Sequence, residues 1–379
     1  MSGGDSNTDV NRRAKAWNEK DTTFAAHAAS RHIPLAGTFE LTARCNLRCK
    51  MCYVRMDQSQ FAPGQRELTA AEWIALGKDA AAAGTLNMLI TGGEPLLRPD
   101  FPEIYTALSQ MGFIIILYTN ATLMTPELLA LFQRYPPTMV GVTLYGACRE
   151  TYAKICGDPD AFDATIRGLE MLTRVKTTLE VRCTFIKDNM DELNALRAIA
   201  NRFTNRFAVN FDVFKAIRGA TSNVADCRLT PAQMLDLRQK NHEYYDGLNS
   251  ETQAVIEDSS PIEQTIDTRE YGFSIEPAIL GCLAAKSMYW ITWDGKMLAC
   301  GSFSSPYTFP LSEGFVPAWN RLPGLFEGVR YPEECYSCEY ISAGCPNCPA
   351  TVQSESGSMD MISSYICAIA KERWERSKA

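Results

Sequence analysis

Residues 37–52 read Gly37-Thr-Phe-Glu-Leu-Thr-Ala-Arg-Cys45-Asn-Leu-Arg-Cys49-Lys-Met-Cys52, an apolar run that leads directly into three cysteines. The run predicts a short buried strand, so the cysteines occupy the loop at its carboxyl end. The next such run is followed in the same way by Thr91-Gly92-Gly93-Glu94-Pro95. Because parallel strands present their carboxyl ends at one edge of a sheet, we expect both loops at the edge where barrel folds place active sites.

Short apolar runs alternate with helical patterns over the first two thirds of the chain. Helices begin at recognisable signals, such as the capping box Thr69-Ala-Ala-Glu72 and the prolines after Thr125 and Thr230. The predicted strands are 37–42, 86–91, 113–119, 139–144, 179–185 and 207–214. Alternation of this kind predicts a parallel sheet. Six strand–helix units are fewer than the eight of a closed barrel, and the GxGxxG signature of a doubly wound sheet does not occur.

The predicted fold is therefore α/β, a partial (β/α)6 TIM-like barrel followed by a small Cys-rich domain that binds iron–sulfur clusters. We expect four segments, which are a partly helical lead-in, the barrel, a polar connection and the Cys-rich domain, at residues 1–35, 36–246, 247–276 and 277–379.

Composition excludes several classes of protein. The net charge of −7 argues against a surface that follows nucleic-acid phosphates, and no apolar run is long enough to span a membrane. The polar, acidic N-terminus is not a secretory signal. Histidine occurs three times, away from other reactive residues, which argues against His-based zinc catalysis and Ser-His-Asp chemistry. In a cytoplasmic protein the fourteen cysteines stay reduced, so we expect the grouped ones to bind metal.

The chemistry of the first two loops is specific. Three thiolates on one short loop can ligate three irons of a [4Fe–4S] cube, which leaves the fourth iron open to a small molecule that chelates through an amine and a carboxylate. Glycines allow close approach of a ligand to the backbone at Gly92 and Gly93. The alternatives are a structural zinc knot for the cysteines and a simple tight turn for the glycines.

A second group of cysteines lies near the C-terminus. Twelve residues separate Cys282 from Gly295 and four separate Gly295 from Cys300. Then come Cys335-x2-Cys338-x6-Cys345-x2-Cys348 and a final Cys367. Paired CxxC units also suit a four-thiolate zinc ribbon, but seven cysteines exceed the ligands of one zinc site. Seven are enough for one complete [4Fe–4S] cluster and a second held by three. Cys148, Cys156, Cys183 and Cys227 are scattered, and we assign them no function.

The CX3CX2C and GGEP motifs in a strand–helix frame resemble those of the radical S-adenosylmethionine (SAM) superfamily over residues 36–245. The resemblance implies that a cluster held by Cys45, Cys49 and Cys52 binds SAM. It also implies contacts from the chain to SAM. Gly92, Gly93 and Glu94 would meet its amino group, Thr143 its ribose and Arg182 its carboxylate.

The C-terminal cysteines resemble the SPASM extension of a subset of radical SAM enzymes. The family form is C-x(9–15)-G-x4-C, then C-x2-C-x5-C-x3-C and a final C, so the third cysteine of the second element is displaced here by one residue. The family's wiring assigns Cys282, Cys300 and Cys348 to auxiliary cluster I. It assigns auxiliary cluster II to Cys335, Cys338, Cys345 and Cys367.

The resemblance implies that an electron delivered to the first cluster cleaves SAM to a 5′-deoxyadenosyl radical, which abstracts hydrogen from substrate. SPASM relatives mostly modify peptides or proteins, so we expect crosslinking or oxidation of a ribosomally made peptide or protein side chain. A flavodoxin- or ferredoxin-type protein would supply the electron. Sulfatase-maturing relatives carry an aspartate base after the cysteine equivalent to Cys300, whereas Gly301 stands here.

Two alternatives stay open at this point. About 35 residues precede the first strand, too few for an independent leader-binding domain, so a small molecule such as a tetrapyrrole, an amino sugar or a cofactor precursor is the alternative substrate. A non-catalytic iron–sulfur or zinc protein would explain the cysteines, but it would not explain the GGEP loop beside them.

Overall fold

The computed structural model describes residues 24–215, 218, 224–246 and 280–378. Most of the predicted lead-in and the whole of the predicted connection 247–276 lie outside the described residues.

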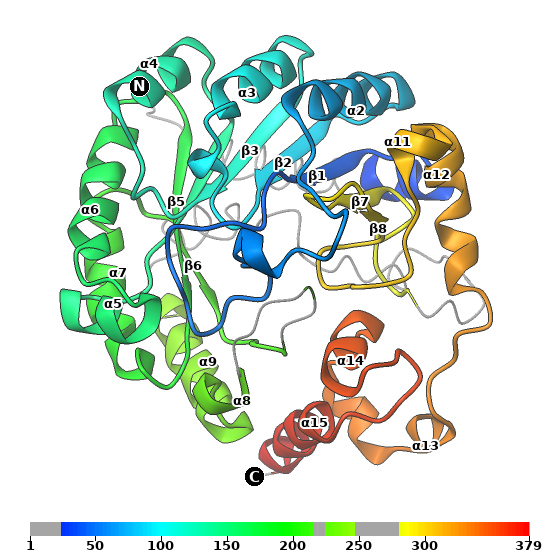
Figure 1. The fold of residues 1–379 in the computed structure, drawn as a ribbon. Coiled ribbons are helices and arrows are strands. Elements are labelled where there is room, and N and C mark those ends of the chain that lie inside the picture. The colour runs from blue at the N-terminus through cyan, green and yellow to red at the C-terminus, as the bar shows by residue number, and fades with distance from the viewer. Residues whose placement is uncertain (1–23, 216–217, 219–223, 247–279, 379) are drawn as a thin grey trace, which may run out of the picture.

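One open sheet carries the fold, and its strands fan across the centre of Figure 1. Its hydrogen-bonded order is β6-β5-β4-β3-β2-β1-β7-β8, in which only the β7–β8 pair is antiparallel. The strands are β1 (Ala36–Glu40), β2 (Asn87–Thr91), β3 (Ile114–Thr119), β4 (Met139–Thr143), β5 (Thr178–Thr184), β6 (Phe207–Asn210), β7 (Met288–Ile291) and β8 (Met297–Leu298). The predicted partial α/β barrel is therefore confirmed.

The first six strands match the predicted runs to within two residues, except at the end of β6. That strand stops at Asn210, where the side-chain amide bonds both backbone groups of Asp212 and replaces the ladder with a turn. Sequence analysis did not anticipate β7, which pairs in parallel with β1 and extends the barrel sheet beyond the six predicted units.

Helices cover the outer face of the sheet (Figure 1). Over the barrel these are α2 (Ala70–Ala83), α3 (Phe101–Gln110), α4 (Pro126–Arg134), α5 (Arg149–Cys156), α6 (Ala161–Leu172), α7 (Leu193–Ala200), α8 (Val224–Cys227) and α9 (Pro231–Asp246). The C-terminal part adds α11 (Pro310–Glu313), α12 (Phe315–Arg321), α13 (Glu333–Tyr336), α14 (Pro349–Ser356) and α15 (Ser364–Ser377). Short 3-10 helices lie at η1 (Gln58–Gln60), η2 (Pro95–Leu97), η3 (Met190–Glu192), η5 (Pro323–Phe326) and η6 (Glu339–Ala343).

The alternation of side chains along β1 separates the core from the barrel interior. Phe39 packs against Trp73 of α2, with ring centroids 4.9 Å apart, and both are fully buried between sheet and helices. Because successive strand side chains point to opposite faces, Thr38 and Glu40 face the inside of the barrel. The same alternation places Tyr118 of β3 and Arg182 of β5 inside, where an ordinary core would have apolar residues.

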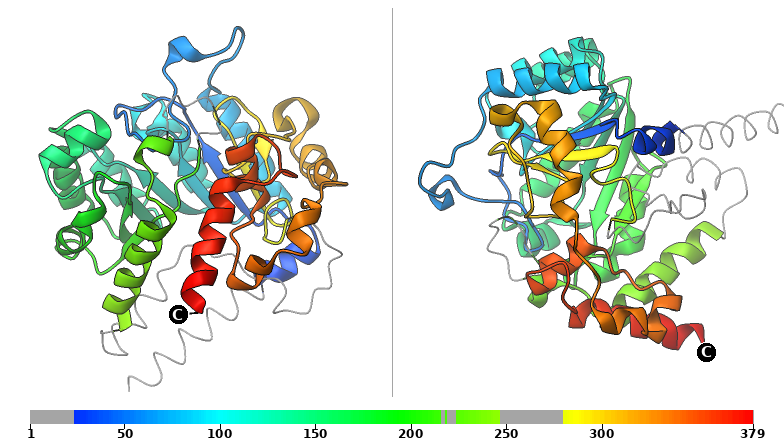
Figure 2. Two further views of the ribbon diagram at one scale, coloured as in Figure 1. Left: turned by 90° about the horizontal axis from the view of Figure 1, so that it is seen from below. Right: turned by 90° about the vertical axis from the view of Figure 1, so that its right-hand side faces the viewer.

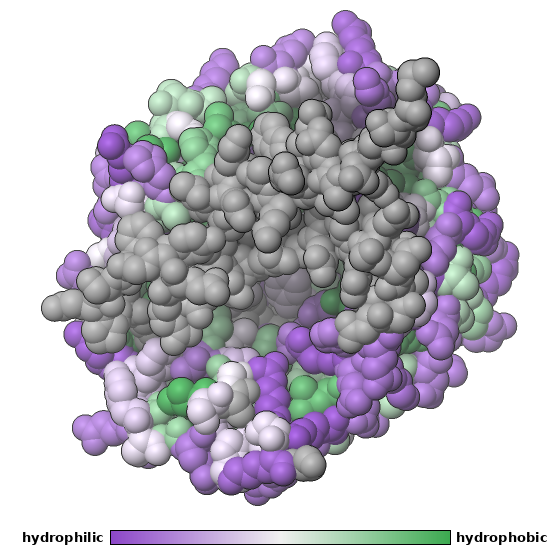
Figure 3. All heavy atoms as spheres, turned by 180° about the vertical axis from the view of Figure 1, so that it is seen from behind, coloured by the Kyte–Doolittle hydropathy of each residue, from purple (hydrophilic) through white to green (hydrophobic). Residues whose placement is uncertain are grey.

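The C-terminal part contacts both edges of the sheet. β7 and β8 extend it beyond β1, while α15 packs beside α9 at the β6 end, as both views in Figure 2 show. Within the part of the chain that the structure describes, no helix has the length and apolar character needed to cross a bilayer. On the side shown in Figure 3, the coloured surface is hydrophilic along its rim and carries small separate apolar patches.

Candidate active site

The loop of Cys45, Cys49 and Cys52 is fixed from two sides. At its start, Leu41 N–H donates to the Thr91 carbonyl at 2.8 Å and so joins the ends of β1 and β2. Further along, Arg48 N–H and Lys50 N–H each donate at 3.0 Å to carbonyls at the end of α5. The backbone around the cysteines is therefore held by neighbouring elements.

The three thiols of this loop interact with one another. Burial raises the pKa of Cys45, and the negative charges of Glu94, Cys49 and Cys52 raise it further. Burial, and then the negative charge of Cys49, raise the pKa of Cys52 to about 11. Thiolates become favourable here only when a cation lies among them, which is what iron supplies.

Two residues beside these thiols were not singled out from the sequence. The Cys156 thiol, at the end of α5, is hydrogen-bonded to Cys49 and is the largest cause of the raised pKa of Cys49. Tyr145 also bonds Cys49, and it lies near enough to Cys45 and Cys52 for their charges to raise its own pKa. No local motif marks either residue, because the end of β4 and the end of α5 reach the loop only through the fold.

The Gly92-Gly93-Glu94 segment lies directly against the backbone that precedes Cys45. Gly93 N–H donates to the Thr42 carbonyl at 2.6 Å, and Glu94 N–H donates to the Arg44 carbonyl at 2.9 Å. A Cβ on Gly93 would overlap the Arg44 carbonyl oxygen and lie 2.7 Å from the Ala43 oxygen. Glycine is therefore required by this close approach, and the two predicted loops do meet at one edge of the sheet.

The Glu94 carboxylate is fully buried and bonded within the protein. One oxygen accepts from Leu96 N–H at 3.0 Å and from Thr119 Oγ1 at 2.7 Å, and the other accepts from Asn120 N–H at 2.7 Å. Burial raises the pKa of Glu94 to about 7 although these bonds oppose the shift. The side chain thus joins the GGEP loop to the end of β3, and the contact of Gly92, Gly93 and Glu94 with the SAM amino group stays a prediction.

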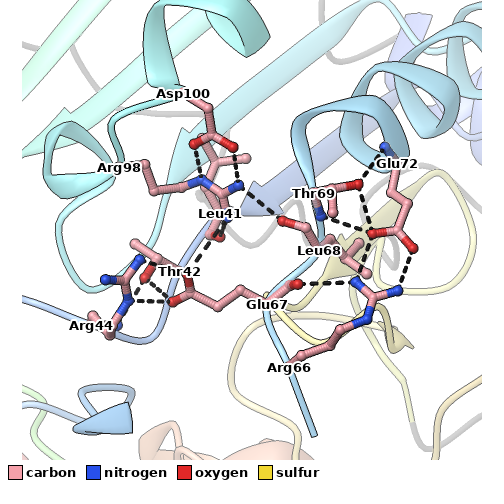
Figure 4. Close-up of polar contacts among 10 residues, drawn as sticks. All are labelled: Leu41, Thr42, Arg44, Arg66, Glu67, Leu68, Thr69, Glu72, Arg98 and Asp100. Atoms are coloured by element: carbon pink, nitrogen blue, oxygen red, sulfur yellow. Dashed lines mark hydrogen bonds and ion pairs between the residues drawn. The ribbon is translucent and has the colours of Figure 1, made fainter.

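A second polar network holds the backbone that leads into the cysteine loop (Figure 4). Glu67 accepts from Arg44 at 3.0 and 2.8 Å and also from the Thr42 hydroxyl. Arg98, which is buried, donates to the Leu41 carbonyl at 2.8 Å and forms an ion pair with Asp100 at 2.7 Å. These contacts fix residues 41–44, immediately before the first cysteine.

Thr143 and Arg182 are opposite each other in the β4–β5 register. Arg182 Nη1 donates to Tyr118 Oη at 2.8 Å and to the buried Glu180 at 2.7 Å, and its guanidinium lies 4.3 Å from the centroid of the Tyr118 ring. Thr143 is half-buried. Both residues therefore face the barrel interior, and their contacts with SAM stay predictions.

The C-terminal cysteines fall into two electrostatically linked groups. The pKa of Cys300 is raised to about 12 by burial and then by Cys348 and Cys282. A second group comprises Cys335, Cys338, Cys345 and Cys367. Burial, and then the charges of other members of the group, raise the pKa values of Cys335, Cys345 and Cys367. Cys348 thus lies with Cys282 and Cys300 despite its proximity in sequence to Cys345. Their roles as ligands of auxiliary clusters stay predictions.

The donor sets suit a multi-iron cluster. Among the described residues, no three His, Cys, Asp or Glu side chains converge on a point that would hold a single metal ion. A [4Fe–4S] cube takes its thiolates at separate corners and does not need such convergence. All fourteen cysteines lie in the described ranges and are free thiols. The residues present therefore fit clusters at the three positions that the cysteines define.

A buried acidic group, not anticipated from the sequence, lies between the first cysteine loop and the C-terminal part. Glu40 Oε2 accepts from Arg218 at 2.5 Å and from Trp290 Nε1 at 2.9 Å. Arg218 also donates to the carbonyls of Gly301 and Phe303. Glu40, Arg218 and Trp290 are far apart in the sequence, so no spacing pattern could have indicated this group.

The Trp290 ring fills the space that a side chain on Gly301, directly after Cys300, would need. A Cβ on Gly301 would lie 2.6 Å from the nearest carbon of that ring. An aspartate at this position would therefore clash, which gives a physical reason for glycine where sulfatase-maturing relatives carry a base.

The described residues also line a cavity of about 720 Å³ between α3 and α4, on the outside of the barrel. Phe101, Thr106 and Leu131 contribute to its wall, and the candidate cysteines do not. The cavity is therefore separate from the cysteine loop and from the Gly92–Glu94 loop.

Comparisons with known proteins agree with this geometry. Residues 39–199 match the model of the Radical SAM superfamily. An AdoMet-dependent heme synthase of Methanosarcina barkeri is 28% identical over 337 residues, which cover 84% of this chain and 92% of that protein. The sporulation killing factor maturation protein SkfB of Bacillus subtilis is 24% identical over 241 residues, or 62% of this chain and 57% of SkfB.

The fold recurs in solved structures. Streptococcus suis SuiB bound to its precursor peptide SuiA superposes with a TM-score of 0.65 at 17% identity, over 89% of this chain and 77% of SuiB. At that identity the likeness shows the fold alone.

Proposed function

We propose a function from the premise that residues 39–199 form a radical SAM domain, so that the protein is a radical SAM enzyme that binds a [4Fe–4S] cluster and SAM. The observation that carries the proposal is the contact between the Cys45 loop and the Gly92–Glu94 backbone at one edge of the sheet. We propose that Cys45, Cys49 and Cys52 hold the cluster and that the second loop receives the SAM amino group, with Thr143 and Arg182 on its ribose and carboxylate.

When bound, the reduced cluster supplies the electron that cleaves SAM to methionine and a 5′-deoxyadenosyl radical, which removes hydrogen from substrate. The chain's own residues hold these groups in place and exclude water. Thr42, Arg44 and Glu67 fix the backbone before Cys45, and Glu94 fixes the facing loop, so little reorganisation is needed when SAM binds. Interior side chains on β1, β5 and β7 then surround the substrate.

For the substrate we propose a ribosomally made peptide or protein side chain, which is crosslinked or oxidised. Support comes from the SkfB relative and from an interior that offers a buried acceptor, Glu40, to N–H groups. A tetrapyrrole is the second candidate, because the heme synthase relative matches over 84% of this chain. Soret-band titration with an iron porphyrin and mass spectrometry of a peptide library, both run anaerobically, separate the two candidates.

We propose that the two C-terminal cysteine groups hold auxiliary clusters in a SPASM-like domain. Iron and sulfide analysis of reconstituted protein should then give roughly eight to twelve irons per chain with matching sulfide. A flavodoxin- or ferredoxin-type donor would supply the electron. Fourteen free thiols further support a reducing compartment such as the cytoplasm.

The first experiment is anaerobic reconstitution followed by mass spectrometry for 5′-deoxyadenosine, with dithionite as reductant. We expect production by wild type and none after Cys45→Ala, Cys49→Ala and Cys52→Ala are combined. The matched control combines Cys148→Ala, Cys183→Ala and Cys227→Ala, which changes three cysteines outside the proposed clusters. Absence of SAM cleavage in wild type with a full iron content would instead favour an electron carrier or a binding protein.

A further inference from the structure

Glu40 is a buried carboxylate inside the barrel whose two oxygens differ. Oε2 accepts from Arg218 and from Trp290 Nε1, as described above. Oε1 is buried and has no hydrogen-bond partner among the described residues. A buried acceptor that stays unpaired is destabilising, and most buried polar atoms are satisfied. Oε1 is therefore an acceptor, on an otherwise well-held carboxylate, that a bound group could satisfy.

Glu40 is close to both of the loops proposed to bind clusters. Arg218, which holds Glu40, places its guanidinium 5.6 Å from the ring of Tyr53, the residue that follows Cys52. The same guanidinium bonds the Gly301 and Phe303 carbonyls, immediately after Cys300. Glu40 thus lies between the loop proposed to bind SAM and the loop proposed to bind auxiliary cluster I.

The charges around Glu40 favour a neutral donor. Arg218 compensates the carboxylate directly, and Asp294 adds a negative charge nearby. An N–H group of a peptide can bond Oε1 without adding charge to the site. A carboxylate, such as those on the rim of a tetrapyrrole, would meet an electron-rich oxygen there and would be repelled.

We propose that Glu40 Oε1 accepts a hydrogen bond from a backbone N–H of a peptide substrate and orients the peptide beside the C–H bond that is cleaved. This inference rests on the proposed function and deepens it by naming the substrate class and one of its contacts. Arg218 and Trp290 are positioning residues, because they act on the substrate through Glu40.

The test uses the full chain, reconstituted anaerobically with SAM, and a synthetic library of short peptides as the probe. Retained peptides are identified by mass spectrometry. Glu40→Leu should lower retention of the selected peptides about tenfold. The double variant Glu40→Leu with Arg218→Met removes both members of the ion pair, so it tests the same contact without leaving a buried arginine unpaired. Iron content and far-UV circular dichroism report whether each variant has folded.

Glu355→Gln is the matched control. Glu355 is also buried and also pairs with an arginine, Arg228, at 2.6 Å, but its other bond is to the backbone N–H of Lys215 and it has no bond to Glu40. We expect it to retain peptides as wild type does.

Backbone N-methylation of the selected peptide removes the hydrogen-bond donor from the peptide and leaves the protein unchanged. Methylation at one position should weaken binding to wild type about tenfold and leave binding to Glu40→Leu unchanged, which is the signature of a direct contact. Equal loss in both proteins at every position would overturn the inference. Wild-type protein that cleaves SAM but retains no peptide would also overturn it, while leaving the proposed radical chemistry intact.

Discussion

The two cysteine-bearing regions of this molecule are held in place by different means. The loop of Cys45, Cys49 and Cys52 lies on a sheet edge, and the backbone of residues 41–50 donates hydrogen bonds to β2 and α5 and accepts them from the GGEP loop. Residues 331–378 consist of short helices in which the fully buried apolar side chains are few, namely Ala350, Val352, Ile366, Ile369 and Ala370. Several large side chains there, such as Tyr336 and Met361, are exposed. The first region is thus held by the barrel, whereas we expect the second to depend more on what its cysteines bind.

The largest effect should follow removal of the C-terminal thiols. Exchange of Cys335, Cys338, Cys345 and Cys367 for alanine should make residues 331–378 sensitive to proteolysis, because bound metal contributes most of the local folding free energy, on the order of 10 kcal/mol in small metal domains. Limited proteolysis with mass spectrometry measures this. The triple alanine variant of the first loop serves as the control and should keep its barrel intact. Equal resistance to proteolysis with and without the four thiols would contradict the difference drawn between the two regions.

The next largest effect is expected from Gly93→Ala, which tests how the loop of Cys45, Cys49 and Cys52 is held. Its new Cβ would overlap the Arg44 carbonyl, so one of the two facing loops must move. We expect SAM affinity to fall about tenfold or more, which corresponds to ~1.4 kcal/mol. Equilibrium dialysis with labelled SAM gives the value. Gly324→Ala is the control, since its Cβ would meet only Glu327 at 3.8 Å.

A smaller effect is expected from Glu67→Gln. The change weakens the bonds to Arg44 and removes a negative charge 3.8 Å from the buried Arg98, although Arg98 keeps its pair with Asp100. We expect the free energy of unfolding to fall by ~1–3 kcal/mol in urea titrations. Asp160→Asn, which breaks an exposed pair with Arg149, should change it by less than ~1 kcal/mol. Similar values for the two variants would show that the network in Figure 4 does not stiffen the loop.

The smallest effect concerns the start of α2. The hydrogen bond from Arg66, ahead of those from Thr69, lowers the pKa of Glu72 to about 2. Because the folded state favours the carboxylate, this contribution is complete above the ordinary pKa of about 4.3 and is lost as the pH falls toward about 2. Glu72→Gln should cost ~0.5–1 kcal/mol at neutral pH.

Urea unfolding of both proteins between about pH 7 and about pH 3 tests this assignment, since the difference between them should shrink as the pH falls. A difference that stays constant over that interval would contradict it.

Much of the barrel was predictable because its signals are local. The apolar runs and the Thr69–Glu72 capping box depend on neighbours in sequence, and the two loops meet because parallel strands share an edge. The pairing of β7 with β1 was not predictable, because it joins segments about 250 residues apart. Glu40, Trp290 and Arg218 come together only through that pairing.

Cys156 illustrates the same limit within the candidate site. From the sequence it is one of four scattered cysteines, and burial alone explains such a residue. Its contact with Cys49 arises because the end of α5 hydrogen-bonds the cysteine loop. The division of the C-terminal cysteines into two groups, by contrast, is the one that the SPASM resemblance implies, and the structure places Cys348 near Cys282 and Cys300.

The sheet is open in its hydrogen bonding, yet its two edges are tethered through the chain. From β8 the polypeptide passes through the C-terminal helices to α15, which is fastened to α9 at the β6 side by Arg376 and Asp236 at 2.8 Å. Tyr365 and Arg228 add further attachments along the way. The C-terminal region therefore connects the β8 edge of the sheet to the helices beside β6. A cut in the backbone of this region would leave the two edges joined only through the strands between them.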